Sequence, residues 1–355
     1  MGQFTLGILF DGMQDVNKFI AFAKEAEKLG IHSVWIAEHF CFRDALITAA
    51  ALVKEIHKVE IVPGPLSPYV RHPMILAMAI STLGELAPER IGINLGVGNI
   101  NAQHEFGVNV EHPISTMIEA IETIRKLLEG NGVYYQGKRF VFHGAKMGFT
   151  VSSIPIYLSA IGPKMLATAG LHADGVVLSA GISPKFARLC LEKVECARNK
   201  GGHDQRPFKR VGFVIASAAN ETEVAYDASK GLLSYLFRTP FLEEDWKLNN
   251  INIDHQSILE AIRRRDWEKA KSYISDEAVH FHTISGSPPE FKKRFQEYMF
   301  AGYDQLVLFL VGSPENRKLA LKLALDIAKK TAMVSNGAQL EKKGTSTNYL
   351  YNNSK

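Results

Sequence analysis

Short runs of β-branched and aliphatic residues alternate with longer amphipathic runs along most of this chain, and that alternation limits its fold more than any other feature. Parallel strands need a crossover connection, usually a helix, so the alternation is typical of a parallel sheet. The 355 residues contain eight strand candidates, at 4–10, 33–36, 60–63, 91–96, 156–159, 175–178, 210–216 and 305–310. Eight strand–helix repeats predict a single closed (β/α)8 barrel, the TIM barrel of the α/β class.

Two segments interrupt the alternation and are predicted to be insertions in a barrel that spans 1–334. Aromatic and β-branched residues flank a Gln-Gly-Lys turn, so the insertion at about 132–150 is predicted to contain a β-hairpin. The insertion at 240–287 is polar, charged and partly helical, which is typical of a lid or an interface element. The tail 335–355 is rich in Asn, Lys, Ser and Thr, and we expect it to be disordered.

Charge and cysteine content limit the partners and the compartment. The net charge of +4 is spread along the chain and 263–265 is typical of a solvated helix face, so we expect no nucleic-acid partner. No apolar run reaches the roughly 18 residues of a membrane helix, and no leader is recognisable. Cys41, Cys190 and Cys196 form no CxxC pair and are expected to be free thiols. We expect a cytoplasmic homodimer or higher homo-oligomer that acts on a small-molecule substrate and binds no membrane.

Polar residues directly follow the second strand, where active-site residues of a TIM barrel lie. Glu38 and His39 occupy this position, and a carboxylate and an imidazole can act as acid, base or hydrogen-bonding positioner. A Glu-His dipeptide is also common in purely structural places.

Glycines follow the fourth strand, where Gly96 and Gly98 precede Asn99 and would let a ring or phosphate approach the backbone closely. The segment is not a dinucleotide fingerprint, because Asn101 replaces the third glycine and no helix is expected to open directly there.

The turn after the fifth strand has the features of a phosphate site. Ile161 and Gly162 precede Pro163 and Lys164, and a proline in the first helical turn leaves free N–H groups beside a cation. The alternative is an ordinary turn with a surface lysine. Ser179 follows the sixth strand and would face the same mouth of the barrel.

Metal chemistry and nucleotide hydrolysis are disfavoured by the motifs. His280 and His282 alternate and could share one strand face, but two histidines without a third ligand are more often structural. No HExxH, GxSxG or Walker pattern occurs, so we expect no metal site.

The third strand runs into the most specific motif of the chain, the ten residues Gly-Pro-Leu-Ser-Pro-Tyr-Val-Arg-His-Pro at 64–73. With Trp-Ile-Ala-Glu-His-Phe at 35–40 and Leu-Gly-Val-Gly at 95–98, it resembles the luciferase-like flavin and deazaflavin oxidoreductases. Within them the similarity is closest to the 5,10-methylenetetrahydromethanopterin reductase branch. The resemblance covers 1 to about 314 and is weakest over 240–287.

The resemblance implies hydride transfer with the deazaflavin coenzyme F420, whose ring would lie in the barrel mouth and whose phosphate would lie near 162–164. Trp35, the Glu38–His39 pair and a bulge of Gly64, Pro65 and Leu66 would shape the ring site. The bulge of such barrels holds a cis peptide, and the alignment places it between Gly64 and Pro65. Arg71 and His72 either have a role at this loop or cap the next helix and brace the barrel.

The chain departs from the family pattern at several positions. Leu9 stands where the reductases carry a glutamate, so a proton donor is missing and Asp11 or Glu38 would have to replace it. Glu38 itself replaces the more usual aspartate, a form shared with flavin monooxygenases. An FMN-dependent monooxygenase and a non-catalytic flavin-binding barrel are therefore the alternatives to an F420-dependent enzyme.

Overall fold

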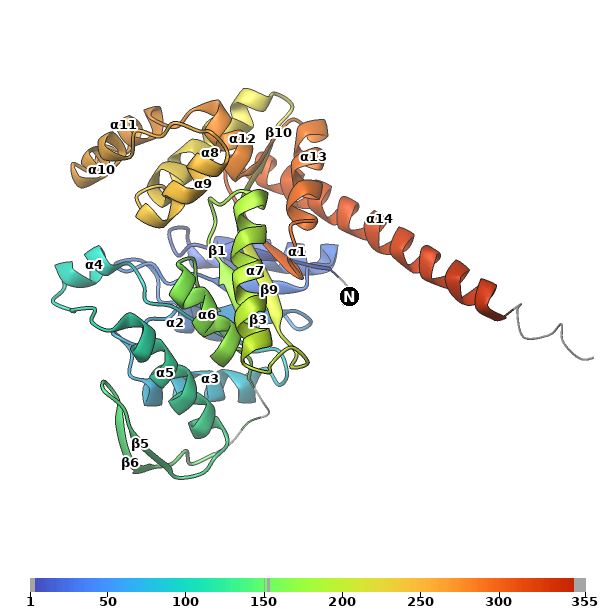
Figure 1. Ribbon diagram of the computed structural model, residues 1–355. Coiled ribbons are helices and arrows are strands. Elements are labelled where there is room, and N and C mark those ends of the chain that lie inside the picture. Colours follow the sequence, from blue (N-terminus) through green and yellow to red (C-terminus); the bar gives the residue numbers. More distant parts are fainter. Residues whose placement is uncertain (1–3, 150, 152–153, 348–355) are drawn as a thin grey trace, which may run out of the picture.

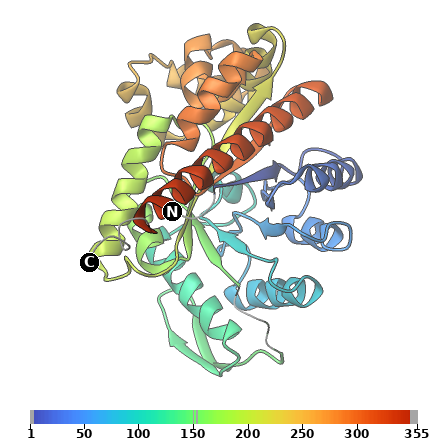
Figure 2. The ribbon, with the colours of Figure 1, turned by 90° about the vertical axis from the view of Figure 1, so that its right-hand side faces the viewer.

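A computed structural model describes residues 4–149, 151 and 154–347 and shows a barrel of parallel strands surrounded by helices (Figures 1 and 2). The barrel strands are β1 (Thr5–Phe10), β2 (Ser33–Ile36), β3 (Glu60–Pro63), β4 (Ile93–Leu95), β7 (Ile156–Ser159), β8 (Gly175–Leu178), β9 (Lys209–Ala218) and β11 (Gln305–Leu310). Their order is β3-β2-β1-β11-β9-β8-β7-β4, and backbone bridges from Ile61 to Ile91 and from Leu66 to Leu95 join its two ends. The predicted (β/α)8 barrel and its eight strands are confirmed.

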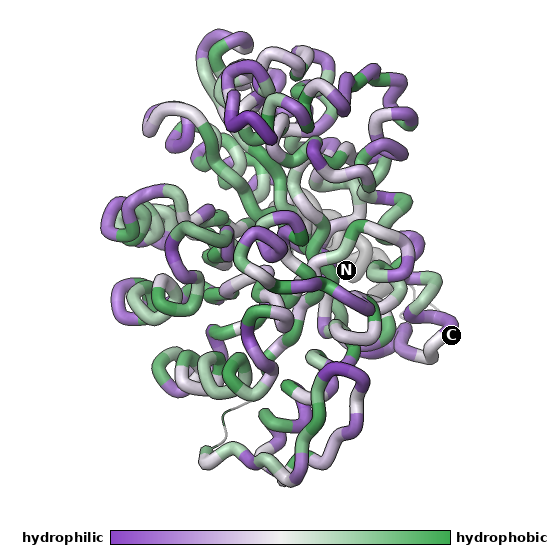
Figure 3. The backbone as a smooth tube through the Cα atoms, turned by 90° about the vertical axis from the view of Figure 1, so that its left-hand side faces the viewer, coloured by the Kyte–Doolittle hydropathy of each residue, from purple (hydrophilic) through white to green (hydrophobic). Residues whose placement is uncertain are grey.

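Helices cover the outside of the barrel between successive strands. They are α1 (Val16–Leu29), α2 (Ala45–Leu52), α3 (Pro73–Leu86), α5 (Pro113–Leu128), α6 (Pro163–His172), α7 (Pro184–Lys200), α8 (Thr222–Leu236), α13 (Pro288–Met299) and α14 (Pro314–Thr347). Figure 2 shows α1, α2 and α3 side by side in chain order. Figure 3 shows stretches of hydrophobic residues through the middle of the molecule, whereas hydrophilic residues are frequent along its periphery.

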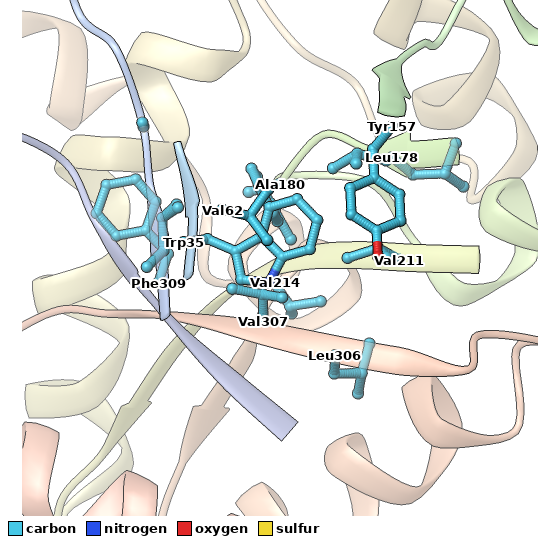
Figure 4. Close-up of a cluster of buried hydrophobic side chains, with 14 of the residues drawn as sticks. Trp35, Val62, Tyr157, Leu178, Ala180, Val211, Val214, Leu306, Val307 and Phe309 are labelled. Carbon is cyan, nitrogen blue, oxygen red and sulfur yellow. The ribbon is translucent and has the colours of Figure 1, made fainter. Parts of the chain in front are cut away.

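Aromatic and aliphatic side chains pack together in the core of the barrel (Figure 4). The Trp35 ring lies 5.3 Å from that of Tyr157 and 5.4 Å from that of Phe213, measured between centroids. Trp35 is 0% exposed, and its indole N–H donates to Ser33 Oγ at 2.9 Å. The expectation that Trp35 shapes a ligand site is therefore wrong. Strand alternation does turn it inward, but it lies in a packed layer below the mouth.

The first insertion is the predicted hairpin, formed by β5 (Val133–Gln136) and β6 (Val141–Ala145) in antiparallel pairing. Glu119 of α5 fixes its turn, because its carboxylate accepts the backbone N–H groups of Lys138, Arg139 and Phe140 at 2.8 to 3.0 Å.

The second insertion is mostly helical and lies at the end of the molecule opposite the hairpin (Figure 1). It contains the 3-10 helix η1 (Pro240–Leu242), α9 (Glu243–Leu248), α10 (His255–Arg263), α11 (Trp267–Ser272), α12 (Asp276–His282) and the short strand β10 (Ile284–Gly286), which extends the sheet beside β9. His280 and His282 therefore lie on a helix and share no strand face, because helical hydrogen bonding overrides their alternation.

A buried polar cluster attaches this insertion to the barrel. Asp245 of α9 is 0% exposed, and its carboxylate accepts the N–H and hydroxyl of Ser183 at 2.7 and 2.5 Å. The side-chain amide of Asn249 donates to the same carboxylate at 2.8 Å. Burial raises the pKa of Asp245 to about 6, although these hydrogen bonds oppose the shift. Ser183 follows β8 and caps α7, so the cluster joins α9 to the end of a barrel strand.

The C-terminal segment differs from the prediction. Helix α14 continues to Thr347 and its C-terminal part projects away from the barrel (Figure 1), so 335–347 is helical rather than disordered. Ala, Gln, Leu, Glu and Lys in this stretch are good helix formers and outweigh its polar composition. Residues 348–355 lie outside the described residues.

We predict that Asp245→Ala lowers the free energy of unfolding by roughly 3 to 5 kcal/mol, because it leaves the buried donors of Ser183 and Asn249 unsatisfied. Urea denaturation at pH 7 measures the change, and Glu243→Ala, on the exposed face of the same helix, is the control. An Asp245→Ala variant as stable as this control would show that the cluster does not hold the insertion.

Candidate functional site

Two cavities lie at opposite ends of the barrel. The larger, about 510 Å³, is lined by residues at the beginnings of strands, including Asp174 before β8 and Lys209 of β9. The smaller, about 150 Å³, lies at the strand ends and is lined by Ile161, Ser179, Ala180, Leu236, Arg238, Thr239 and Leu242. The chemistry of TIM barrels resides at the strand ends, so the smaller cavity marks the candidate site despite its size.

The predicted acid Glu38 is held in an ion pair. Arg71 Nη2 lies 2.5 Å from Glu38 Oε1 and 2.5 Å from Asp44 Oδ2, and Arg71 Nε donates to Glu38 Oε2 at 3.3 Å. Hydrogen bonding to Glu38 raises the pKa of Arg71, against its partial burial. Glu38 is therefore occupied in fixing the loop rather than in offering a proton.

His72 shows the structural role that the sequence left open. Its Nδ1 accepts the backbone N–H of Met74 at 3.1 Å and caps α3. Arg71 braces the loop after β2, so both residues support the barrel mouth from the β3–α3 loop.

His39 is a partly exposed titratable residue in the loop that follows β2. Its Nδ1 lies 2.9 Å from the backbone carbonyl oxygen of Asp11. A carbonyl only accepts, so Nδ1 carries the proton and the neutral ring presents the lone pair of Nε2. Burial lowers the pKa of His39, and the positive charge of Arg238 lowers it further. The hydrogen bond to Asp11 and the negative charge of Asp11 raise this pKa and partly offset the effect of burial. His39 is thus a hydrogen-bond acceptor and candidate base at neutral pH.

The bulge after β3 has the predicted cis peptide between Gly64 and Pro65. A Cβ on Gly64, whose φ is +126°, would lie 2.0 Å from the Asn94 carbonyl oxygen, so only glycine fits there. Leu66 is 0% exposed, and its N–H and C=O bond to Asn94 and Gly96 of the β4 segment. Within the bulge Gly64 and Leu66 are buried and Pro65 is partly exposed, so Pro65 is the best placed of the three to contact a ligand, and the contacts predicted for Gly64 and Leu66 stay a prediction.

The loop after β4 also differs from its prediction. A short helix, α4 (Ile100–Glu105), opens directly after Asn99, whose side chain caps it by accepting the N–H of Ala102 at 3.3 Å. Gly96 is buried against Pro65, since a Cβ there would lie 2.7 Å from Pro65 Cβ. Gly98 remains exposed at the mouth with a φ of +84°.

The turn after β7 keeps the features of an anion site. Helix α6 begins at Pro163 as predicted, and Gly162 provides no side-chain cap for its first N–H groups. Lys164 is exposed and forms no ion pair with the described residues. Phe241 of the insertion lies over this turn, 3.3 Å from where a Cβ of Gly162 would be.

The structure thus brings Ile161 and Ser179 together in one cavity wall, and adds two residues that sequence reasoning missed, Arg238 and Phe241. Both belong to the segment around the second insertion, which carries no recognisable motif.

Among the described residues no cluster of three or more His, Cys, Asp or Glu could hold a metal ion. In the same residues no helix combines the length and apolar character needed to cross a membrane.

Comparisons with known proteins agree with this geometry. The model of the luciferase-like monooxygenase family matches residues 4–305. The 5,10-methylenetetrahydromethanopterin reductase of Archaeoglobus fulgidus is 30% identical over 301 residues, covering 84% of this chain and 90% of that protein. The F420-dependent glucose-6-phosphate dehydrogenase of Kineococcus radiotolerans is 30% identical over 325 residues, covering 85% and 89%. The solved structure of the coenzyme F420-dependent tetrahydromethanopterin reductase of Methanopyrus kandleri has a TM-score of 0.81 at 25% identity, covering 91% and 98%.

We predict that His39 titrates below 6.5, with Nδ1 protonated in the neutral form, because burial disfavours the imidazolium. The unfolded chain then binds the proton more readily, so His39 lowers stability as pH falls through 6.5 toward its folded-state pKa. Two-dimensional ¹⁵N NMR of the imidazoles measures both properties, with His39→Gln to assign the signal. A pKa above 6.5, or a proton on Nε2 at pH 8, would contradict this assignment.

Proposed function

We propose that this chain, which belongs to the luciferase-like monooxygenase family, is an oxidoreductase that transfers a hydride to or from the deazaflavin coenzyme F420. The observation that carries the proposal is that relatives with different substrates share one coenzyme. Relatives that act on a tetrahydromethanopterin and on glucose-6-phosphate, and that align with most of this barrel, are both named as F420-dependent. The coenzyme is thus the common element, whereas the substrate varies.

The residues at the mouth fit such a coenzyme. The uncapped start of α6 and the unpaired Lys164 provide N–H groups and a cation for its phosphate. Gly64 and Gly96 are buried, whereas Pro65, after β3, and His39, after the neighbouring strand β2, are partly exposed at the strand ends. A planar ring between Pro65 and His39 is the arrangement that these features support.

The deazaflavin, when bound, supplies the hydride chemistry itself. The residues of this chain position the reactants, exclude water and handle the proton. Arg71 fixes the loop that carries His39, and the Asp11 carbonyl fixes its tautomer, so Nε2 is the atom that accepts a proton or hydrogen bond. Two residues of the insertion cover part of the mouth. Phe241 lies over the Gly162 turn and Leu242 lines the cavity, which limits the access of water.

The leading substrate is a methylenetetrahydromethanopterin, as in the Archaeoglobus relative. Leu9 lies inside the barrel at 8% exposure, so no acid enters from β1 at that level. Asp11 is two residues further on, at the strand end, and its carboxylate accepts the N–H of Met13 at 2.9 Å. Of the two acids considered as replacements, Asp11 is the better placed proton donor because Glu38 is bound to Arg71.

Side-by-side titration with coenzyme F420 and FMN tests the proposal. We expect F420 to bind at least tenfold more tightly, and Lys164→Ala to weaken its binding by roughly 1 to 3 kcal/mol through loss of a charge-assisted contact. Lys185→Ala, near the start of α7, is the matched control. Preference for FMN would favour the monooxygenase alternative, and F420 binding without substrate-dependent bleaching would favour a non-catalytic barrel.

We also propose that the protein forms a homo-oligomer through helices α2 and α3. Ile47 of α2 is 73% exposed, and Ile75 and Met78 of α3 are 52% and 46% exposed. These residues share an outward face with Leu86, and the two helices contain a single charged residue, Glu85. A second copy of this face would cover it.

The free thiols of Cys41, Cys190 and Cys196 support the proposal of a reducing, cytoplasmic location.

We predict that Met78→Glu shifts the protein to a monomer, because the carboxylate would be buried unpaired in the interface. Light scattering after size-exclusion chromatography measures the mass, with Phe300→Glu, an exposed apolar position elsewhere, as the control. A wild-type monomer, or an oligomer unaffected by Met78→Glu, would reject this surface.

A further inference from the structure

Arg238 is a cation in the wall of the cavity at the strand ends, and neither the proposed coenzyme site nor the proposed proton transfer involves it. It lies just after α8, where the chain enters the second insertion, and shares the cavity of about 150 Å³ with Ile161 and Ser179. Its positive charge contributes to the lowered pKa of the His39 imidazole. Arg238 therefore lies in the wall of the cavity at the strand ends.

The guanidinium has no anionic partner. Within the described part of the chain, its hydrogen bond is to the Tyr235 carbonyl oxygen at 2.7 Å, and no carboxylate lies within 4.0 Å. The guanidinium carbon Cζ of Arg238 lies over the Tyr235 ring, 3.6 Å from its centroid. Other half-buried arginines such as Arg71 and Arg210 each form a bidentate pair with a carboxylate. A partly buried cation without an anionic partner is unfavourable unless a ligand supplies an anionic group that pairs with it.

The position of Arg238 is fixed before any ligand arrives. Nε2 of His255 donates to the Arg238 carbonyl oxygen at 3.2 Å, and the His255 ring packs against Trp246, with centroids 5.4 Å apart. Trp246 follows Asp245, which is bound to Ser183 at the end of β8. These contacts hold the backbone of Arg238, and the Tyr235 carbonyl oxygen and ring hold its guanidinium. Such preorganisation lowers the entropic cost of association.

Apolar side chains surround the same mouth. Phe241 is 55% exposed over the Gly162 turn, and Phe106 is 45% exposed and packs against Phe40 beside Gly98. A ligand that satisfies this surface has an aromatic or apolar body and an acidic group that reaches Arg238.

We propose that Arg238 binds an anionic oxygen group, a carboxylate or a phosphate, of the ligand in this cavity and so selects acidic substrates. The inference rests on the proposed function and deepens it. The acidic group comes either from the substrate or from the coenzyme, because both would approach the cavity wall formed by Ile161 and Ser179.

Three measurements on Arg238→Met test this proposal, with Arg238→Lys as a variant that keeps the charge and Arg263→Met, on the exposed face of α10, as the control. The first is the thermal shift caused by inorganic phosphate without coenzyme, in a Lys164→Ala background that removes the site at α6. The second is the dissociation constant of coenzyme F420, and the third is the KM for methylenetetrahydromethanopterin.

We expect Arg238→Met to abolish the phosphate shift and to weaken one of the two organic ligands about tenfold, with partial recovery in Arg238→Lys. A raised KM with unchanged F420 binding assigns the acid to the substrate, and the reverse assigns it to the coenzyme. If wild-type protein fails to bind F420, the proposed function fails, yet the phosphate shift still decides the role of Arg238. Unchanged values in all three measurements would overturn the proposal.

Discussion

The ion pair of Arg71 with Glu38 and Asp44 is the interaction on which the geometry of the mouth depends. It joins the loop after β2 to the loop after β3, which are the two loops that carry His39 and Pro65. Glu38 precedes His39 directly in the loop after β2, so the ion pair also restrains the backbone that carries His39. The Asp11 carbonyl then sets the tautomer of His39, so a single network orients the candidate base and supports the wall that faces it.

The second insertion completes the site from the other side. The buried carboxylate of Asp245 holds α9 against Ser183, and from there the chain places Arg238 and Phe241 at the mouth. The barrel strands therefore supply one half of the candidate site, and the segment around the insertion supplies the other. We expect the substrate preference to depend on this second half, because one barrel architecture can host many activities.

Local sequence patterns were sufficient to predict the barrel. They were insufficient to predict how deeply a single side chain is buried and which residues it contacts. Strand runs, the hairpin, the start of α6 and the cis bond follow from short-range signals and from the family motif. Trp35 was misassigned because alternation gives its direction but not its layer. A spacing of two residues is compatible with a shared strand face but cannot exclude a helix, and His280 and His282 lie on α12. Arg238 carries no sequence signal because its place in the cavity wall arises only from the folded chain.

The central claim is that a deazaflavin lies at the strand ends between Pro65 and His39. A crystal structure of the protein with coenzyme F420 tests it most directly. We predict that the ring lies against the Gly64–Pro65 bulge, with Nε2 of His39 toward it and the phosphate at the start of α6 beside Lys164. A coenzyme bound instead in the cavity of Asp174 and Lys209, at the opposite end of the barrel, would contradict it.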